Sequence, residues 1–176
     1  MNRKRFLGGM AALAAVPIIG RLAADDEAPP QAGQQAAQVP RLEKSEAAWR
    51  ELLPREAYAV LFEEKTERAG SSPLDKEYGE GTYVCAACFL PLFDSEAKFD
   101  SGTGWPSFWQ PIGGSVGTKR DFKMILPRTE YHCIRCGGHQ GHVFNDGPPP
   151  TGKRYCNNGV ALRFIAAGEE LPALRT

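Results

Sequence analysis

The chain has 176 residues, of which 42% are hydrophobic, and its 21 Lys and Arg residues balance its 21 Asp and Glu residues. This length predicts one ordinary domain with some additional chain, and this composition excludes wholesale disorder. The balanced charge argues against a nucleic-acid-binding protein, and no apolar run is long enough for an ordinary membrane-spanning helix.

The charge is unevenly distributed along the chain. Residues 1–24 contain four basic residues and no acidic one, so the remainder holds 17 basic against 21 acidic residues, a net charge of −4. A basic cluster at 3–5 precedes an apolar stretch over 6–19 and small residues at 22–24, which is the layout of a secretory signal.

The first residues also resemble a twin-arginine export signal, with Lys4 in place of the second arginine. We therefore expect residues 1–24 to direct export to a bacterial periplasm. The alternatives are an uncleaved amphipathic N-terminus or a misplaced start, and the protein would then be cytoplasmic. Residues 25–40 are rich in Ala, Gln and Pro and predict a flexible linker, so the globular domain is expected over 41–176.

Two short helices are predicted to open the domain. Ser45 is a helix cap for the residues that follow it, and Pro54 ends that helix and begins a second one that runs to about Glu64. The apolar residues expected to pack into the core are Trp49, Leu52, Leu53, Tyr58, Leu61 and Phe62.

The residue composition of the sequence changes after Gly79. Short segments rich in β-branched and aromatic residues, at 81–84, 121–126, 141–144 and 160–165, are separated by Gly, Pro, Asn or Asp. The pattern predicts a mainly β, antiparallel domain with a small helical lead-in.

Four of the five cysteines form two Cys-x-x-Cys pairs, which are Cys85 with Cys88 and Cys133 with Cys136. Two such pairs can complete a tetrahedron of thiolates around one structural Zn²⁺, with no position left for a catalytic water. His132 adjoins the second pair, but four thiols already fill the shell. The alternatives are two local disulfides or a thioredoxin-like redox motif.

The fifth cysteine, Cys156, is flanked by Arg154 and Asn158. If this stretch is extended, the three side chains share one face, and the guanidinium favours the thiolate form of Cys156. The cysteine is therefore predicted to be a nucleophile rather than an inert buried thiol.

Two histidines precede this cysteine in the sequence. His139 and His142 can give or take protons near neutral pH, and Asp146 either orients one of them or only forms a turn. The Gly- and Pro-containing loop over 102–109 exposes aromatic rings that can hold a methyl or thioether group. For Phe108 and Trp109, packing into the core is an equal alternative.

Four motifs carry a resemblance to a known family. Residues 81–88 (GTYVCAAC), 99–108 (FDSGTGWPSF), 136–144 (CGGHQGHVF) and 154–158 (RYCNN) together resemble the type B peptide-methionine (R)-S-oxide reductases. The resemblance covers about residues 42–165. It implies two antiparallel sheets with a short N-terminal helical segment and a structural zinc.

The resemblance also implies an activity, the thiol-dependent reduction of methionine-R-sulfoxide, peptide-bound or free, to methionine. Cys156 would attack the sulfoxide sulfur and become a sulfenic acid, while His142, with His139 nearby, would hold or protonate the sulfoxide oxygen. Trp105 would hold the methyl group. The groups that would tune and orient these three are Arg154, Asp146 and Asn158.

Many members of this family carry a resolving cysteine where this chain has Thr103. Because every other thiol is assigned to the zinc, we predict no internal catalytic disulfide and direct reduction by an external, thioredoxin-like thiol. We expect a monomer that acts on oxidised methionine in proteins or peptides. The alternative function is a non-catalytic, zinc-stabilised β binding module, which would need neither Cys156 nor His142.

Overall fold

The computed structural model describes residues 39–123 and 127–176. The predicted export signal over 1–24 and almost all of the predicted linker over 25–40 lie outside the described residues. Among the helices that are described, none has the length and apolar character needed to cross a membrane.

Two short helices open the described chain, as predicted. Helix α1 spans Glu46–Leu52 and helix α2 spans Arg55–Glu63. Ser45 caps α1, because its hydroxyl oxygen accepts a hydrogen bond from the N–H of Ala48 at 3.2 Å. Pro54 stands at the N-cap of α2, where its missing N–H leaves no donor unsatisfied.

The predicted buried faces of these helices are confirmed with one exception. Leu52 is 42% exposed, whereas Trp49, Leu53, Tyr58 and Leu61 are buried, and Phe62 is half-buried and packs against the core. The reason is that α1 ends at Leu52, so Leu53 takes an extended backbone and packs into the core instead.

Within the described residues, nine strands form two antiparallel sheets, which confirms the predicted fold class. The first sheet has the order β2-β1-β9, and the second has the order β3-β4-β8-β7-β6-β5. The strands of the first sheet are β1 (Gly81–Cys85), β2 (Pro91–Asp94) and β9 (Leu162–Ala166). The strands of the second are β3 (Lys98–Phe99), β4 (Ser107–Phe108), β5 (Val116–Asp121), β6 (Arg128–Cys133), β7 (His139–Phe144) and β8 (Arg154–Asn157). The described chain also has three 3₁₀ turns: η3 (Pro73–Lys76) precedes β1, η4 (Ser95–Ala97) lies between β2 and β3, and η5 (Gly159–Ala161) lies between β8 and β9.

Of the strand predicted over 121–126, residues 124–126 lie outside the described residues, and only Asp121 belongs to a described strand. Strand β5 ends at Asp121, and Phe122 is 72% exposed. Strand β5 lies over Val116–Asp121 because its backbone pairs in register with β6, and this pairing compensates for its polar composition.

Aromatic rings from both sheets meet in the core. Phe93 of β2 stacks on Phe108 of β4 with ring centroids 4.2 Å apart, and Tyr83 of β1 meets Phe108 edge-on at 4.9 Å. All three residues are fully buried. Packing of this kind holds one sheet against the other, since the buried rings supply much of the apolar area.

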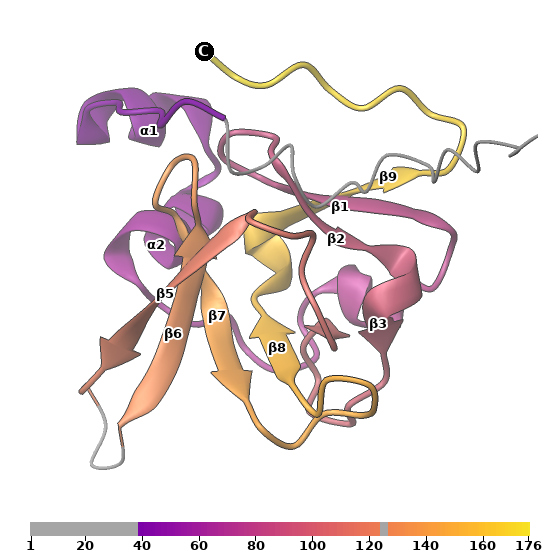
Figure 1. Cartoon of the computed structure of the whole chain (residues 1–176). Helices are drawn as coiled ribbons and strands as arrows, with labels where there is room; N and C mark the ends of the chain where they lie inside the picture. Colours follow the sequence, from indigo (N-terminus) through magenta and orange to yellow (C-terminus); the bar gives the residue numbers. More distant parts are fainter. Residues whose placement is uncertain (1–38, 124–126) are drawn as a thin grey trace, which may run out of the picture. The chain divides into compact units, whose positions relative to one another are not determined.

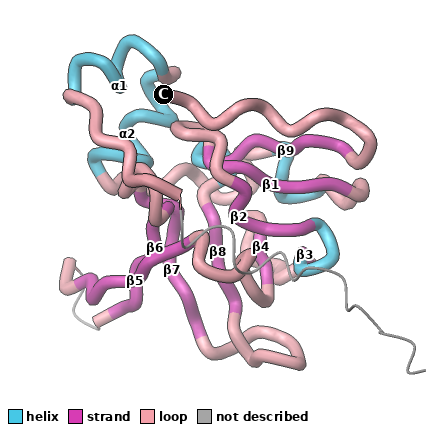
Figure 2. Tube along the Cα trace, turned by 45° about the horizontal axis from the view of Figure 1, so that its top comes forward, coloured by secondary structure: helices cyan, strands magenta, loops and turns pink. Residues whose placement is uncertain are grey.

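Helix α2 packs against the second sheet at strand β7. It also packs against η5, and both helices lie beside β6 and β7 in the two views of the backbone (Figure 1, Figure 2). The segment that follows α2 then runs past the ends of β7 and β8. This path brings residues 64–67 to the side chains that β7 and β8 carry.

Candidate active site and metal centre

The four paired cysteines converge at one point, as predicted. The first pair comes from the end of β1 and the turn that leads to β2, and the second from the end of β6 and the turn that leads to β7. The four sulfur atoms lie within 4.8 Å of one another, with 3.7 Å between Cys85 and Cys136 and 3.5 Å between Cys88 and Cys133.

This cluster has the size that a metal ion needs. A tetrahedron with sulfur about 2.3 Å from its centre has edges of about 3.8 Å, close to the observed spacings. Because one pair comes from each sheet, a bound ion would fasten the two sheets together. His132 takes no part in the cluster and instead contacts Glu130.

Cys156 lies on β8 in a row of side chains that crosses the second sheet. Its direct neighbours are Ser107 on β4 and His142 on β7, and the row continues from His142 to Glu130 on β6 and Lys119 on β5. Residues that stand opposite each other in antiparallel strands share a face. The row therefore places His142 beside Cys156.

Strands β7 and β8 approach closely at this row because β7 has a glycine there. A Cβ at Gly141 would collide with the carbonyl oxygen of Cys156. Glycine at this position therefore allows the strand that carries His142 to pair with the strand that carries Cys156.

The pKa of the Cys156 thiol is raised in this structure. Burial is the main cause, while the charge of Arg154 and a hydrogen bond from Thr103 act in the opposite direction. The predicted effect of Arg154 is thus present, but burial outweighs it. Cys156 consequently rests mainly as a thiol, and a proton must leave it before it can attack a substrate.

Arg154 is held rigidly beside Cys156. Its Nε and Nη2 donate to the two carboxylate oxygens of Asp146 at 2.9 Å each, and its guanidinium lies 4.4 Å from the ring centroid of Phe144. Within the described residues, Asp146 thus pairs with Arg154 and not with His139 or His142.

A small cavity of 120 Å³ opens at Cys156. It is well below the about 300 Å³ of pockets that enclose drug-sized ligands, so it suits a single side chain. Phe108 is buried in the core and Trp109 bonds to the carbonyl of Glu96, so neither lines this cavity. Its lining residues are Thr66, Trp105, Arg128, Gly141, His142, Phe144, Cys156, Asn157 and Asn158.

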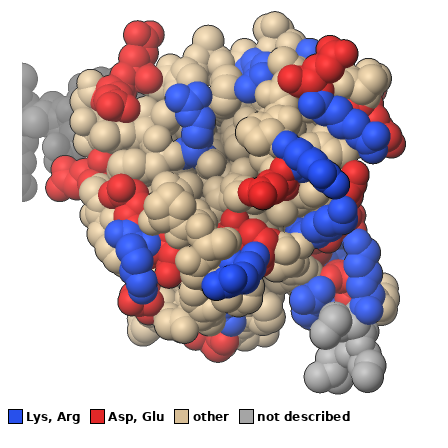
Figure 3. Space-filling model, turned by 180° about the vertical axis from the view of Figure 1, so that it is seen from behind, with Lys and Arg blue, Asp and Glu red and all other residues tan. Residues whose placement is uncertain are grey.

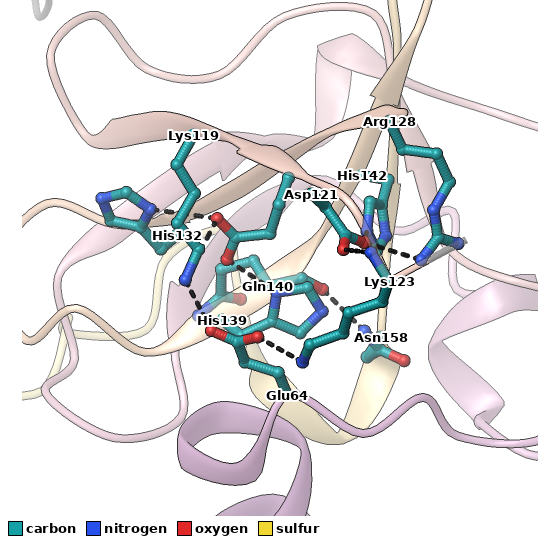
Figure 4. Close-up of polar contacts among 11 residues, drawn as sticks. Glu64, Lys119, Asp121, Lys123, Arg128, His132, His139, Gln140, His142 and Asn158 are labelled. Carbon is teal, nitrogen blue, oxygen red and sulfur yellow. Dashed lines mark hydrogen bonds and ion pairs between the residues drawn. The ribbon is translucent and has the colours of Figure 1, made fainter. Parts of the chain in front are cut away.

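His142 bonds to a carboxylate that the sequence did not single out. Its Nε2 lies 2.7 Å from Oδ2 of Asp121, and the same oxygen accepts a hydrogen bond from Arg128 at 2.7 Å (Figure 4). Burial lowers the pKa of His142, while the bond to Asp121 opposes that shift. The imidazole is therefore mainly neutral at pH 7.

His139 belongs to a second, more deeply buried pair. Its Nδ1 lies 2.7 Å from Oε1 of Glu130, and both side chains are only 3% exposed. Its ring meets that of His142 edge-on at 5.4 Å. His139 therefore packs against the ring of His142 and does not line the cavity that contains Cys156.

Asn158 is held by hydrogen bonds on both sides. Its Nδ2 donates to the carbonyl oxygen of Gln140 at 2.9 Å, and its Oδ1 accepts from the N–H of Glu67 at 3.0 Å. The carbonyl of Glu67 in turn accepts a hydrogen bond from Nε1 of Trp105 at 3.3 Å. One backbone segment thus links two of the predicted site residues.

A protein-family model decides where the chain belongs. The model of the SelR domain matches residues 53–166, well over half of the chain. The chain belongs to the SelR domain family. The resemblance that the four motifs carry is thereby confirmed.

Several curated relatives match most of the SelR domain. A peptide methionine sulfoxide reductase of Agrobacterium fabrum is 51% identical over 126 residues, which are 71% of this chain and 93% of the relative. One from Bradyrhizobium diazoefficiens is 53% identical over 122 residues, 69% of this chain and 88% of the relative. One from Methanosarcina barkeri is 51% identical over 124 residues, 70% of this chain and 87% of the relative.

The SelR domain brings together all the residues that the sequence predicted for the site. Cys156, His142, Trp105 and Asn158 line one cavity, and Arg154 with Asp146 and His139 support it. The residues that the sequence missed are Glu67, Asp121, Arg128 and Glu130. No spacing in the sequence marks them, since their contacts arise from strand register and from the path of the chain after α2.

Proposed function

We propose that this chain reduces methionine-R-sulfoxide in peptides to methionine and so repairs oxidised proteins. The observation that carries the proposal is a single thiol outside the metal cluster, placed beside a histidine in a cavity the size of one side chain. The name shared by the relatives of this SelR chain, peptide methionine sulfoxide reductase, supports the same reaction.

In this reaction the Cys156 sulfur attacks the sulfoxide sulfur, and the bond between that sulfur and its oxygen breaks. A thiol and a sulfoxide become a sulfenic acid and a thioether, so the thiol proton ends on the transferred oxygen. His142 stands beside Cys156 and carries this proton. Trp105 closes the cavity around the apolar methyl group.

The sulfenic acid is then reduced by a thiol from outside the chain. Two external thiols return it to the thiol form and leave as a disulfide, with release of one water. The other four cysteines of the chain lie in the metal cluster, and Thr103 stands beside Cys156. We also propose that the chain acts as a monomer. Mass spectrometry after turnover should find no disulfide between Cys156 and a cluster cysteine.

We infer that the ion in the cysteine cluster is zinc. Four thiolates at tetrahedral spacing suit Zn²⁺ and leave it no open position. Its contribution is structural, since it would fasten the β1–β2 turn to the β6–β7 turn. Elemental analysis of the purified protein should find one zinc per chain, and another metal or none would overturn this assignment.

The reaction is tested with a racemic methionine sulfoxide peptide and a dithiol. Turnover should stop near half conversion and leave the S epimer. Cys156→Ser should abolish turnover while keeping the metal, because Cys156 lies outside the cluster. Metal retention without any turnover by the intact protein would overturn the reductase proposal and favour a binding module.

We also propose that residues 1–24 export the protein to a bacterial periplasm. The support is the basic start followed by an apolar stretch. Cell fractionation and N-terminal sequencing test this proposal together. A full-length N-terminus in the cytoplasmic fraction would overturn it.

A further inference from the structure

The carboxylate of Asp121, at the end of β5, is held by contacts to both of its oxygens. Its Oδ2 contacts Nε2 of His142 and the guanidinium of Arg128, each at 2.7 Å, and its Oδ1 accepts the N–H of Lys123 at 2.9 Å. The side chain is only 9% exposed. The Lys123 bond, followed by the His142 bond, holds the pKa of Asp121 well below its usual range. Asp121 is therefore a permanent negative charge beside the imidazole.

The bond to Asp121 also decides which ring nitrogen of His142 serves the cavity. Nε2 is engaged with the carboxylate, so Nδ1 is the nitrogen left for a substrate oxygen (Figure 4). His142 lines the cavity together with Cys156 and stands directly opposite it across the β7–β8 pair. The carboxylate, the imidazole and the thiol thus follow one another across three strands.

From this geometry we propose that Asp121 is a positioning residue that stabilises the protonated form of His142 while Cys156 reduces the sulfoxide. The inference rests on the proposed function and adds a residue to it. Asp121 acts through His142 and does not itself line the cavity that contains Cys156.

Other charged groups face His142, but among the described residues named here none is a second carboxylate in contact with the ring. Arg128 and Glu130 reach it from β6, His139 from its own strand and Cys156 from β8. Arg128 and His139 lower the pKa of His142, and Glu130 is engaged by His139 at 2.7 Å. Asp121 is the carboxylate in direct contact with the ring.

The proton balance explains why this contact matters. Cys156 and His142 exist either as thiol with imidazole or as thiolate with imidazolium, and both forms have the same net charge. A negative charge on the far side of the ring favours the second form. The thiolate then attacks, the Nδ1 proton moves to the sulfoxide oxygen, and Cys156 is left oxidised as a sulfenic acid with His142 neutral.

The test is the pH profile of single-turnover sulfoxide reduction by Asp121→Asn. The rate of the intact protein should rise through the pKa of His142 to a plateau and fall through that of Cys156. In the variant the lower limb should move to lower pH and the plateau should fall roughly tenfold, because the thiolate–imidazolium form becomes rarer. A lower plateau with an unmoved limb would overturn the proposal.

Two further variants keep the test decisive. Glu64→Gln removes a carboxylate on the same face that bonds to Lys119 and Lys123 instead of His142, and it should keep the normal profile. Asp121→Glu retains the charge and should keep the lower limb in place even if the plateau falls. If this limb moves as in Asp121→Asn, the proposal fails.

Nitrogen-15 NMR of the histidines in the intact protein gives an independent answer without a variant. Neutral His142 should carry its proton on Nε2, and a proton on Nδ1 would overturn the proposal. The two hypotheses fail separately. An intact protein that does not reduce the sulfoxide contradicts the proposed function, whereas normal reduction with an unmoved limb in Asp121→Asn contradicts only the role of Asp121.

Discussion

Glu67 connects more parts of the active site than any residue named by the motifs. Its carbonyl accepts a hydrogen bond from Trp105 at 3.3 Å and its N–H donates to Asn158 at 3.0 Å. Its carboxylate accepts the N–H groups of Gly159 and Val160 at 2.6 and 3.0 Å. Glu67, which follows α2 in the chain, therefore holds both the wall of the cavity and the turn that follows Cys156.

Replacement of Glu67 by Gln should weaken this arrangement. The amide would set an NH₂ donor against a backbone N–H, so one bond becomes repulsive and the other loses its charge. We expect the KM for a sulfoxide peptide to rise about tenfold and the free energy of unfolding to fall by about 2 kcal/mol. Steady-state kinetics and urea unfolding measure both quantities.

Glu63→Gln is the matched control, because Glu63 lies next to this segment but pairs with Lys65 at the surface. It should leave both the KM and the free energy of unfolding nearly unchanged. An unchanged KM in Glu67→Gln would contradict the positioning role of Glu67.

Glu130 should make the stability of the protein depend on pH. Its burial raises the pKa of this carboxyl, but the bonds from His132 and His139 outweigh burial and bring it to about 2, below its ordinary 4.5. A depressed pKa in the folded state contributes stability above the ordinary value, and this contribution is lost as the pH falls from 4.5 towards 2.

The corresponding variant is Glu130→Gln. At pH 7 it should lose about 3 kcal/mol of unfolding free energy, because His139 keeps a buried donor without its charged partner. Urea unfolding at pH 7 and pH 3 should show the difference from the intact protein shrinking at the lower pH. A difference that stays constant between the two pH values would contradict this account.

The motifs predicted Cys156 and His142, which the structure places side by side, but not the carboxylates that contact the two histidines. Cys156 and His142 were predictable because a lone thiol and a histidine have few other uses in such a setting. Asp121 and Glu130 were not, because their partners depend on which strand lies beside which. A carboxylate gives no local signal of a histidine that approaches it from another strand.

At the scale of secondary structure, Gln140 links the metal cluster to the active site. It is fully buried on β7, and its Nε2 donates to the sulfur of Cys85 at 3.5 Å. Its carbonyl accepts both the N–H and the Nδ2–H of Asn158, at 2.8 and 2.9 Å. Within the described residues its Oε1 has no hydrogen-bond partner.

Gln140→Leu should weaken the binding of the metal by the four cysteines while leaving the fold intact. The change keeps the side-chain volume and removes the donor to the thiolate together with the unpartnered oxygen. We expect transfer of the metal to a chromogenic chelator to become about tenfold faster, with a nearly unchanged melting temperature. Gln110→Leu, at an exposed glutamine, is the control, and equal transfer rates in the two variants would contradict the role of Gln140.

The two helices and the two cysteine-containing turns were predictable from the sequence, because their caps, prolines and spacings are local signals. Strand β5 was not. Its sequence over Val116–Asp121 is mostly polar, and only pairing with β6 makes it a strand. Of the segment predicted as a strand, 121–126, only Asp121 belongs to β5, and residues 124–126 lie outside the described residues.

At the scale of the whole molecule, charges of both signs are interspersed over the face that Figure 3 draws, where acidic and basic side chains lie side by side. The backbone near each end of the described chain is fastened to a cysteine-containing turn. Leu42 donates its N–H to the carbonyl of Arg135 at 2.7 Å, and Arg175 donates its N–H to the carbonyl of Cys88 at 3.1 Å.

Removal of residues 171–176 should therefore destabilise the protein. Arg135 is only 8% exposed and donates to the carbonyl of Arg175 at 2.6 Å, so truncation leaves a buried guanidinium short of an acceptor. We expect a loss of about 2 kcal/mol in the free energy of unfolding. Arg175→Ala keeps the backbone contacts and should lose less, and a truncated protein as stable as the intact one would contradict this prediction.

The position of this tail has a practical consequence for engineering. Residues 171, 172 and 174 line a cavity beside Phe89, and within the described chain the tail contributes nothing to the wall around Cys156. A carrier protein or a solid support attached after Thr176 would consequently leave the thiol open to bulky oxidised substrates. Immobilised in that orientation, the chain could serve as a reusable catalyst for restoring oxidised therapeutic proteins.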